Sequence, residues 1–193
     1  MARIYRLKRR AERQNETRQR IVEAAVALHT TLGPNHSSIV AIAERAGVER
    51  PTVYRHFPTT EALFTACSTH YRMQNPPPDP KPWLQIPDPK ARLGRGLGQL
   101  YAHYAAQEKA LWPILRDLED QPELRRYMEV DIKHLHGAID VLMSAWPAIE
   151  AARLRAALGH ATDFFAWRSL RRQGLSNEEA AAFMIDVVMA TIR

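Results

Sequence analysis

The apolar residues of this chain recur at the three- and four-residue spacings that are typical of amphipathic helices. Between residues 17 and 32 they run from Ile21 to Leu32, and Gly33 followed by Pro34 then ends the segment. The pattern predicts a first helix that begins near residue 17. Nowhere do apolar and polar residues alternate over the length of a strand, so we expect an all-α fold.

Three shorter helices are predicted after this one. Ser37 or Ser38 can cap a second helix, which ends at Gly47 because glycine accepts the left-handed backbone of a helix terminus. A third helix begins near Pro51, since proline lacks an N–H that the first helical turn would leave unpaired anyway. The fourth covers residues 59–71. Together these segments predict a small N-terminal helical domain.

The composition changes abruptly after this domain. Residues 76–89 hold seven of the chain's 13 prolines, and no helix can cross such a stretch. We interpret it as a stiff, extended connector between two domains. The predicted organisation is a basic arm at 1–15, the N-terminal domain at 16–75 and a C-terminal domain at 76–193. Helices of the last are predicted at about 89–107, 109–119, 122–145, 147–172 and from Ser176 onward, which makes about nine in all.

Residues 38–57 have the pattern of two short helices that meet at a tight turn. Gly47 supplies the turn, and Ala43 and Ala46 are small enough for a close helix crossing. With Val53 pointing into the core, the third helix presents its other side to solvent. Such a helix fits the major groove of DNA, where arginine can bond to guanine and threonine can contact a thymine methyl group. The outward residues are then Glu49, Arg50, Thr52, Tyr54 and His56.

Positive charge is concentrated at one end of the sequence. Residues 1–20 contain eight Arg and Lys against two Glu, which equals the whole net charge of +6. A cationic arm suits a polyanion such as DNA, because each neutralised phosphate releases counterions. A solubilising tail and a membrane-surface segment are the alternatives. The single cysteine, Cys67, and the lack of a long apolar run favour a cytoplasmic protein with a buried, inert thiol.

Residues 17–64 resemble the N-terminal domain of TetR-family repressors. The resemblance runs through Thr17-Arg-Gln-Arg-Ile-Val-Glu-Ala-Ala25, Ile42-Ala-Glu-Arg-Ala-Gly-Val48, Thr52-Val-Tyr-Arg-His-Phe-Pro58 and Glu61-Ala-Leu-Phe64. It implies a helix-turn-helix whose recognition helix reads bases through Arg50, Pro51 and Thr52. One departure is Thr60, because family members usually carry a phosphate-binding lysine there. The implied DNA-contacting residues are Arg18, Ser37, Ser38, Glu49, Arg50, Pro51, Thr52, Tyr54, His56 and Thr60.

The same resemblance implies that two copies associate through the last two helices and that a small-molecule effector binds among the helices before them. Because one helix-turn-helix reads only a few base pairs, a dimer on a palindrome is also expected on physical grounds. Ordinary core packing explains the same apolar residues equally well. The interface candidates are Ala156, Phe164, Trp167, Phe183 and Val187. The pocket candidates are Leu100, Tyr104, Trp112, Met128, His134 and Met143.

No group of residues has the spacing of a catalytic or metal site. Gly94, Gly96 and Gly98 lack the pattern of a phosphate-binding loop, and His134 and His136 point in different directions on a helix. We therefore expect no catalytic residue, no metal and no cofactor. The resulting interpretation is a homodimeric, sequence-specific, ligand-responsive repressor on a palindromic operator. Its rivals are an enzyme that uses the C-terminal domain and an architectural protein that binds DNA without sequence preference.

Overall fold

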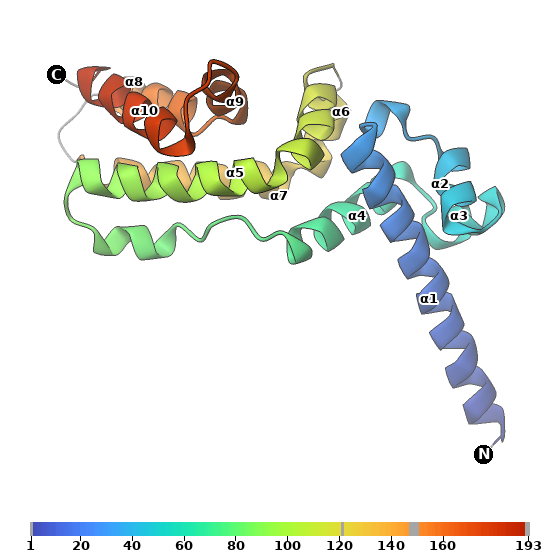
Figure 1. The fold of residues 1–193 in the computed structure, drawn as a ribbon. Coiled ribbons are helices and arrows are strands. Elements are labelled where there is room, and N and C mark those ends of the chain that lie inside the picture. The colour runs from blue at the N-terminus through green and yellow to red at the C-terminus, as the bar shows by residue number, and fades with distance from the viewer. Residues whose placement is uncertain (1, 121, 147–150, 192–193) are drawn as a thin grey trace. The chain divides into compact units, whose positions relative to one another are not determined.

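The computed structural model describes residues 2–120, 122–146 and 151–191. Every regular element in this part of the chain is a helix, ten α-helices and two short 3₁₀ helices, so the all-α prediction is confirmed (Figure 1). The chain divides into two compact units. The first unit comprises Met1–Pro76 and Lys109–Met128, and the second comprises Pro77–Glu108 and Glu129–Arg193.

Helix α1 of the first unit is longer than predicted, because it begins at Ala2 and not near residue 17. Residues 2–20 lack glycine and proline and are rich in Arg, Glu, Gln and Ala, which are strong helix formers. The apolar spacing revealed only the part of α1 that has a core to pack against. The elements of this unit are α1 (Ala2–Thr31), η1 (Pro34–His36), α2 (Ile39–Ala46), α3 (Arg50–His56), α4 (Thr60–Gln74), the end of α5 (Pro89–Asp120) and α6 (Pro122–Tyr127).

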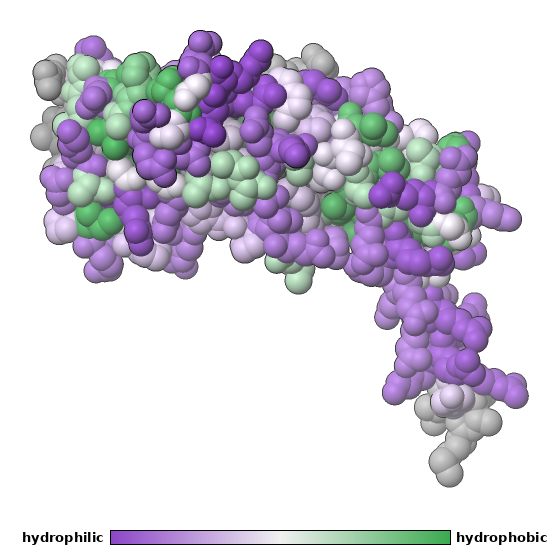
Figure 2. All heavy atoms as spheres, viewed as in Figure 1, coloured by the Kyte–Doolittle hydropathy of each residue, from purple (hydrophilic) through white to green (hydrophobic). Residues whose placement is uncertain are grey.

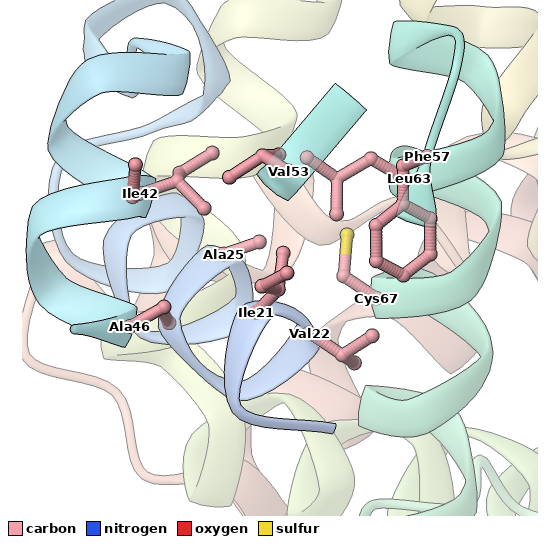
Figure 3. Packing of buried hydrophobic residues seen from close by; sticks show 11 residues of the cluster. Ile21, Val22, Ala25, Ile42, Ala46, Val53, Phe57, Leu63 and Cys67 are labelled. Carbon is pink, nitrogen blue, oxygen red and sulfur yellow. The ribbon is translucent and has the colours of Figure 1, made fainter. Parts of the chain in front are cut away.

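One apolar core joins α1 to α4 (Figure 3). Val53 is the buried residue of α3, and none of its side chain reaches solvent. Burying such a side chain contributes about 1.5–3 kcal/mol, so Val53 determines which side of α3 faces inward. The core contains Ile21, Val22 and Ala25 of α1, Ile42 and Ala46 of α2, Val53 of α3, Phe57 after it, and Leu63 and Cys67 of α4.

The turn between α2 and α3 follows the predicted local rules. The Ser38 hydroxyl caps α2 by accepting a hydrogen bond from the Ala41 N–H (3.1 Å). Gly47 ends α2 with a left-handed backbone (φ 64°), and the Val48 N–H then donates to the Ala43 carbonyl (3.0 Å). The predicted cap and the predicted turn glycine are therefore confirmed.

A buried carboxylate attaches the end of α5 to the turn after α1. Asp117 is 2% exposed and accepts the Asn35 N–H (2.9 Å). Arg116 pairs with Asp117 (2.7 Å) and also donates to the Leu32 carbonyl (3.0 Å). These bonds explain why residues 109–128 belong to the first unit, which the predicted boundary near residue 76 did not foresee.

Gly33 allows this attachment, and a substitution there tests it. A Cβ atom on Gly33 would lie 2.3 Å from Asp117 Oδ2, and the backbone φ of 93° is strained for any side chain. Gly174 has the same φ but open space around it, so Gly174→Ala is a matched control. We expect each alanine to cost about 1–3 kcal/mol of unfolding free energy through backbone strain, and Gly33→Ala to cost distinctly more. Urea denaturation measures both, and equal losses would contradict the role of the Asp117 contact.

A stack of rings connects α1, α4 and α6 within the first unit. The rings of His29 and Phe64 lie 4.7 Å apart, and those of Phe64 and Tyr127 lie 5.1 Å apart. Burial lowers the pKa of His29 to about 4 and raises the pKa of the Cys67 thiol to about 12. Both groups are therefore neutral at pH 7, and Cys67 is buried, as predicted.

The neutral His29 makes the stability of the first unit depend on pH. Because the pKa of His29 is lower in the folded chain than its ordinary 6.5, the unfolded state binds the extra proton between pH 6.5 and 4. The unfolding free energy should then decrease as pH falls through this window, by up to about 3 kcal/mol. His29→Gln should remove this component, as denaturant titrations from pH 7 to 4 would reveal. If both proteins lose stability in parallel, His29 is not the responsible group.

The second unit contains helices whose ends differ from the predicted ones. The expected break at residue 108 is absent, because α5 continues through Pro113, whose missing N–H removes only one helical bond. Breaks occur instead after Tyr127 and at Asp163, whose carboxylate caps the next helix through the Ala166 N–H (2.8 Å). The start of the predicted helix at 147–150 lies outside the described residues. The elements are η2 (Lys81–Gln85), the first part of α5, α7 (Glu129–Met143), α8 (Ala151–Ala161), α9 (Phe164–Arg172) and α10 (Asn177–Thr191).

The proline-rich stretch is folded against the second unit and is not simply an extended connector. Trp83 of η2 is 1% exposed, and its indole N–H donates to Gln99 of α5 (2.7 Å). Gly96 makes room for it, since a Cβ there would come within 3.2 Å of the indole ring. Arg92 is buried too and donates to the carbonyl groups of Ile86 (2.8 Å) and Val141 (3.1 Å).

The predicted capping box at the start of α10 is confirmed. The Glu179 N–H donates to the Ser176 hydroxyl (3.1 Å), and the Ser176 N–H donates to the Glu179 carboxylate (2.7 Å). The latter bond is the main reason that the pKa of Glu179 is lowered. Among the described helices, none is both long and apolar enough to span a bilayer.

Candidate nucleic-acid interface

Helix α3 presents a polar and basic surface on the side opposite Val53. Arg50, Pro51, Tyr54 and Arg55 are exposed, and Thr52 is half-buried at the edge of this surface. The predicted orientation of the helix is therefore the observed one. With seven residues, α3 has the size of a recognition helix that contacts bases through its first turns.

Arg50 and Tyr54 are neighbours on this surface, one helical turn apart. The Arg50 Nη2 atom donates to the Tyr54 hydroxyl (3.2 Å), and the guanidinium lies 5.4 Å from the centre of the Tyr54 ring. The contact orders a long flexible side chain while leaving most of its five N–H donors available. A guanidinium held in this way can form the paired bonds to guanine O6 and N7 with less loss of entropy.

The C-terminal end of α3 is positively charged. The guanidinium of Arg18 lies 4.7 Å from the centre of the Phe57 ring, close to His56. Desolvation by burial lowers the pKa of His56, and the positive charges of Arg55 and Arg18 lower it further. His56 is therefore mainly neutral at pH 7, and Arg18 and Arg55 carry the charge that a phosphate would meet.

Four other predicted DNA-contacting residues have distinct local roles. The Ser37 hydroxyl donates to the Gly33 carbonyl (2.7 Å), which uses its proton within the turn. Ser38 accepts a bond as the cap of α2, so its own O–H remains able to donate to a phosphate. Glu49 is exposed at the N-cap of α3 without a side-chain capping bond. Thr60 is exposed at the start of α4, where Thr59 is the cap (3.1 Å to the Ala62 N–H).

Two basic residues of the motif were missed by the sequence prediction. Arg45 in the last turn of α2 and Arg55 of α3 are both exposed. The signal for Arg55 was present, because two residues after Val53 on an α-helix lie about 160° away from it around the axis. Arg55 therefore points away from the core, with Pro51 beside it.

The six predicted pocket residues are not assembled into one site. Trp112 and Met128 belong to the first unit, and the other four belong to the second. In the second unit Leu100 and Tyr104 are buried, and the Tyr104 hydroxyl donates to the Thr162 carbonyl (2.8 Å). His134 is half-buried and its Nε2 atom donates to the Pro78 carbonyl (2.9 Å), while Met143 is half-buried as well.

The predicted interface residues fall into two groups. Phe164 and Trp167 are buried inside the second unit, where their rings lie 5.5 and 5.7 Å from that of Tyr104. They are core residues, because α9 turns its aromatic side towards α5. Ala156 of α8 is exposed, and so are Phe183 (49%) and Val187 (37%) of α10. These three residues remain available to a second copy.

Comparison with known proteins agrees with this geometry. The sequence pattern of "Bacterial regulatory proteins, tetR family" matches residues 21–67, which include α2, α3 and their core partners. Uncharacterized HTH-type transcriptional regulators of Mycobacterium tuberculosis and Mycobacterium bovis are 38% identical over 56 residues. The matched stretch covers 29% of this chain and 30% of each relative.

Solved structures of similar fold extend over nearly the whole chain. NalD, the secondary repressor of the MexAB-OprM multidrug efflux pump in Pseudomonas aeruginosa, is 24% identical with a TM-score of 0.62, covering 94% of this chain and 98% of that one. The transcriptional regulator FadR of Bacillus subtilis, solved with stearoyl-CoA, is 15% identical with a TM-score of 0.61, covering 91% and 99%. The chain therefore belongs to the TetR family of bacterial regulatory proteins, with the family's sequence signature at residues 21–67 and its fold along the rest.

Proposed function

We propose that this protein is a sequence-specific DNA-binding regulator of transcription that acts as a repressor. The observation that carries the proposal is the orientation of α3, which buries Val53 and exposes Arg50, Pro51, Tyr54 and Arg55. Arginine and tyrosine on such a helix can bond to base edges and to phosphates in the major groove. The sequence match over the same segment supports this role.

The proposal includes a homodimer on a palindromic operator. Two recognition helices related by a dyad, ~34 Å apart, read two half-sites on one face of the duplex. The exposed apolar residues Ala156, Phe183 and Val187 lie on α8 and α10, which pack against each other in the second unit. Exposed phenylalanine and valine on neighbouring helices are suited to a helix-bundle contact with a second copy.

The proposal also includes a small-molecule effector that binds to the second unit. The crystal structure of FadR, which has the same fold, contains stearoyl-CoA. In the present chain Leu100, Tyr104, His134 and Met143 supply apolar surface and a polar imidazole to that unit. An effector that prefers the state with low DNA affinity weakens operator binding by its differential affinity for the two states.

Selection of binding sites from random duplexes tests the whole proposal. We expect a palindrome with half-sites about one helical turn apart, protected in a footprint and competed only weakly by bulk DNA. Binding without any preferred sequence would favour an architectural protein instead. Small molecules can then be screened for those that release the selected duplex.

Removing the Arg50 side chain tests base reading by α3. Arg50→Ala should cost about 1–3 kcal/mol per lost base contact and relax the preference at one or two positions of each half-site. Tyr54→Phe removes only the hydroxyl that accepts from Arg50, so it should weaken binding less and keep the same preferred bases. Affinities for the selected site and for single-base variants measure both effects. A uniform loss on all duplexes would show that Arg50 contacts phosphates and not bases.

Charging the exposed face of α10 tests the dimer. Phe183→Asp should leave the chain folded and convert it to a monomer at concentrations where the natural protein is dimeric, because a carboxylate would be buried against an apolar partner. Leu84→Asp is the matched control, since Leu84 is similarly exposed (48%) but lies in η2. Sedimentation velocity reads the mass and a binding assay reads the operator affinity. A Phe183→Asp protein that stays dimeric would exclude this face as the interface.

A further inference from the structure

A row of arginines runs along the exposed part of α1. At about 100° per residue, its members fall within an arc of about 80° around the helix. The row spans fourteen positions, or about 21 Å at ~1.5 Å per residue. This basic row consists of Arg6, Arg10, Arg13 and Arg20.

The basic row lies on the side of α1 that faces the helix-turn-helix. The guanidinium of Arg20 is 3.6 Å from the position that a Cβ on Gly47 would take, so this end of the row meets the turn between α2 and α3. Gln19, the preceding residue, lies on the other side, where its side-chain amide is 3.4 Å from Nδ1 of His70 on α4. The row therefore continues the basic surface of α2 and α3 along α1.

Within the described part of the chain, the basic row has no acidic partner. Its four arginines are exposed, and none of them takes part in an ion pair there. The acidic residues Glu12 and Glu16 fall outside the arc of the row. Figure 2 shows this stretch of α1 covered by hydrophilic residues. Like charges three and four residues apart repel one another, so an external polyanion would stabilise the row.

The chemistry of this stretch favours nucleic acid over a membrane surface. A helix that lies on a bilayer needs a continuous apolar face opposite its basic one. Between residues 5 and 20 the large apolar side chains are Tyr5 and Leu7, which lie about 160° apart around the helix. Such an arrangement has no membrane-facing side, whereas phosphates require only the arginines.

We propose that the basic row of α1 binds the phosphate backbone of duplex DNA beside the segment that α3 reads, and that it does so as a rigid helix. The inference rests on the proposed DNA-binding function of α3 and extends it. At ~3.4 Å per base pair, a row of about 21 Å adds about six base pairs to the contacted duplex. These contacts add affinity and salt dependence without adding base preference.

Neutralising the row tests whether it contacts DNA. The triple variant Arg6→Gln, Arg10→Gln and Arg13→Gln removes three charges far from the core, which begins at Ile21. If all three bind phosphates, the natural protein should lose about 40-fold more affinity than the variant between 50 and 200 mM salt. A hydroxyl-radical footprint of the variant should also lose its flanking protection. Lys8→Gln, outside the row, is the control and should leave the footprint unchanged.

Two insertions test whether the helix is rigid. Two alanines placed between Asn15 and Glu16 rotate Arg6, Arg10 and Arg13 by about 200° relative to the core, and four alanines rotate them by about 40°. We expect the two-residue insertion to weaken binding as much as the triple variant, and the four-residue insertion to recover most of the affinity. Equal binding by the two insertion proteins would overturn the rigid-helix inference. Circular dichroism verifies that each protein keeps its helix content.

The outcomes separate this inference from the proposed function. An unchanged salt dependence and footprint in the triple variant would overturn the role of the row, while a selected operator that still depends on Arg50 would leave the proposed function standing. If the natural protein prefers no duplex sequence, the proposed function itself fails. Vesicles of phosphatidylglycerol provide the remaining arm: loss of vesicle binding in the triple variant, with unchanged DNA binding, would assign the row to membranes.

Discussion

The insertion of Val53 into the core of α1, α2 and α4 is the contact on which the rest of the first unit depends. A helix of seven residues is too short to be stable alone, so α3 owes both its existence and its orientation to this packing. The small residues Ala43 and Ala46 let α2 approach, and Gly47 reverses the chain between the two helices. Once Val53 is inside, the side chains that can reach a groove are determined by helix geometry.

Helix α1 has two parts with different surroundings. From Ile21 to His29 its side chains are largely packed into the core, whereas residues 5–16 are exposed throughout. The exposed part forms no tertiary core, but it continues the same helix and therefore keeps a defined angular relation to α2 and α3. A charge pattern along it becomes a surface with a direction, which a flexible tail could not provide.

The first unit also includes a segment from much later in the sequence. Asp117 and Arg116 bond to the turn after α1, and Tyr127 stacks on Phe64 of α4. Helix α5 contributes to both units, and Pro113 lies just beyond the point where it passes from one to the other. Proline removes one helical hydrogen bond there, so α5 has a local weak point in the element that the two units share.

The sequence by itself determined the features that depend on neighbours in the chain. The Ser38 cap, the left-handed Gly47 and the reciprocal Ser176–Glu179 bonds were all predicted, because each involves residues at most a few positions apart. The inward side of α3, and with it Arg50 and Tyr54 as outward residues, followed from helical spacing.

Only the tertiary structure decided which surfaces meet. Apolar spacing showed that Phe164, Trp167 and Phe183 are amphipathic positions, but not that the first two are core while the third faces solvent. Nor could it place Asp117 beside Asn35, 82 positions away. The physical reason is that burial depends on which distant element covers a face. Local rules describe a helix and its apolar side, whereas the partner of that side is selected by packing across the whole chain.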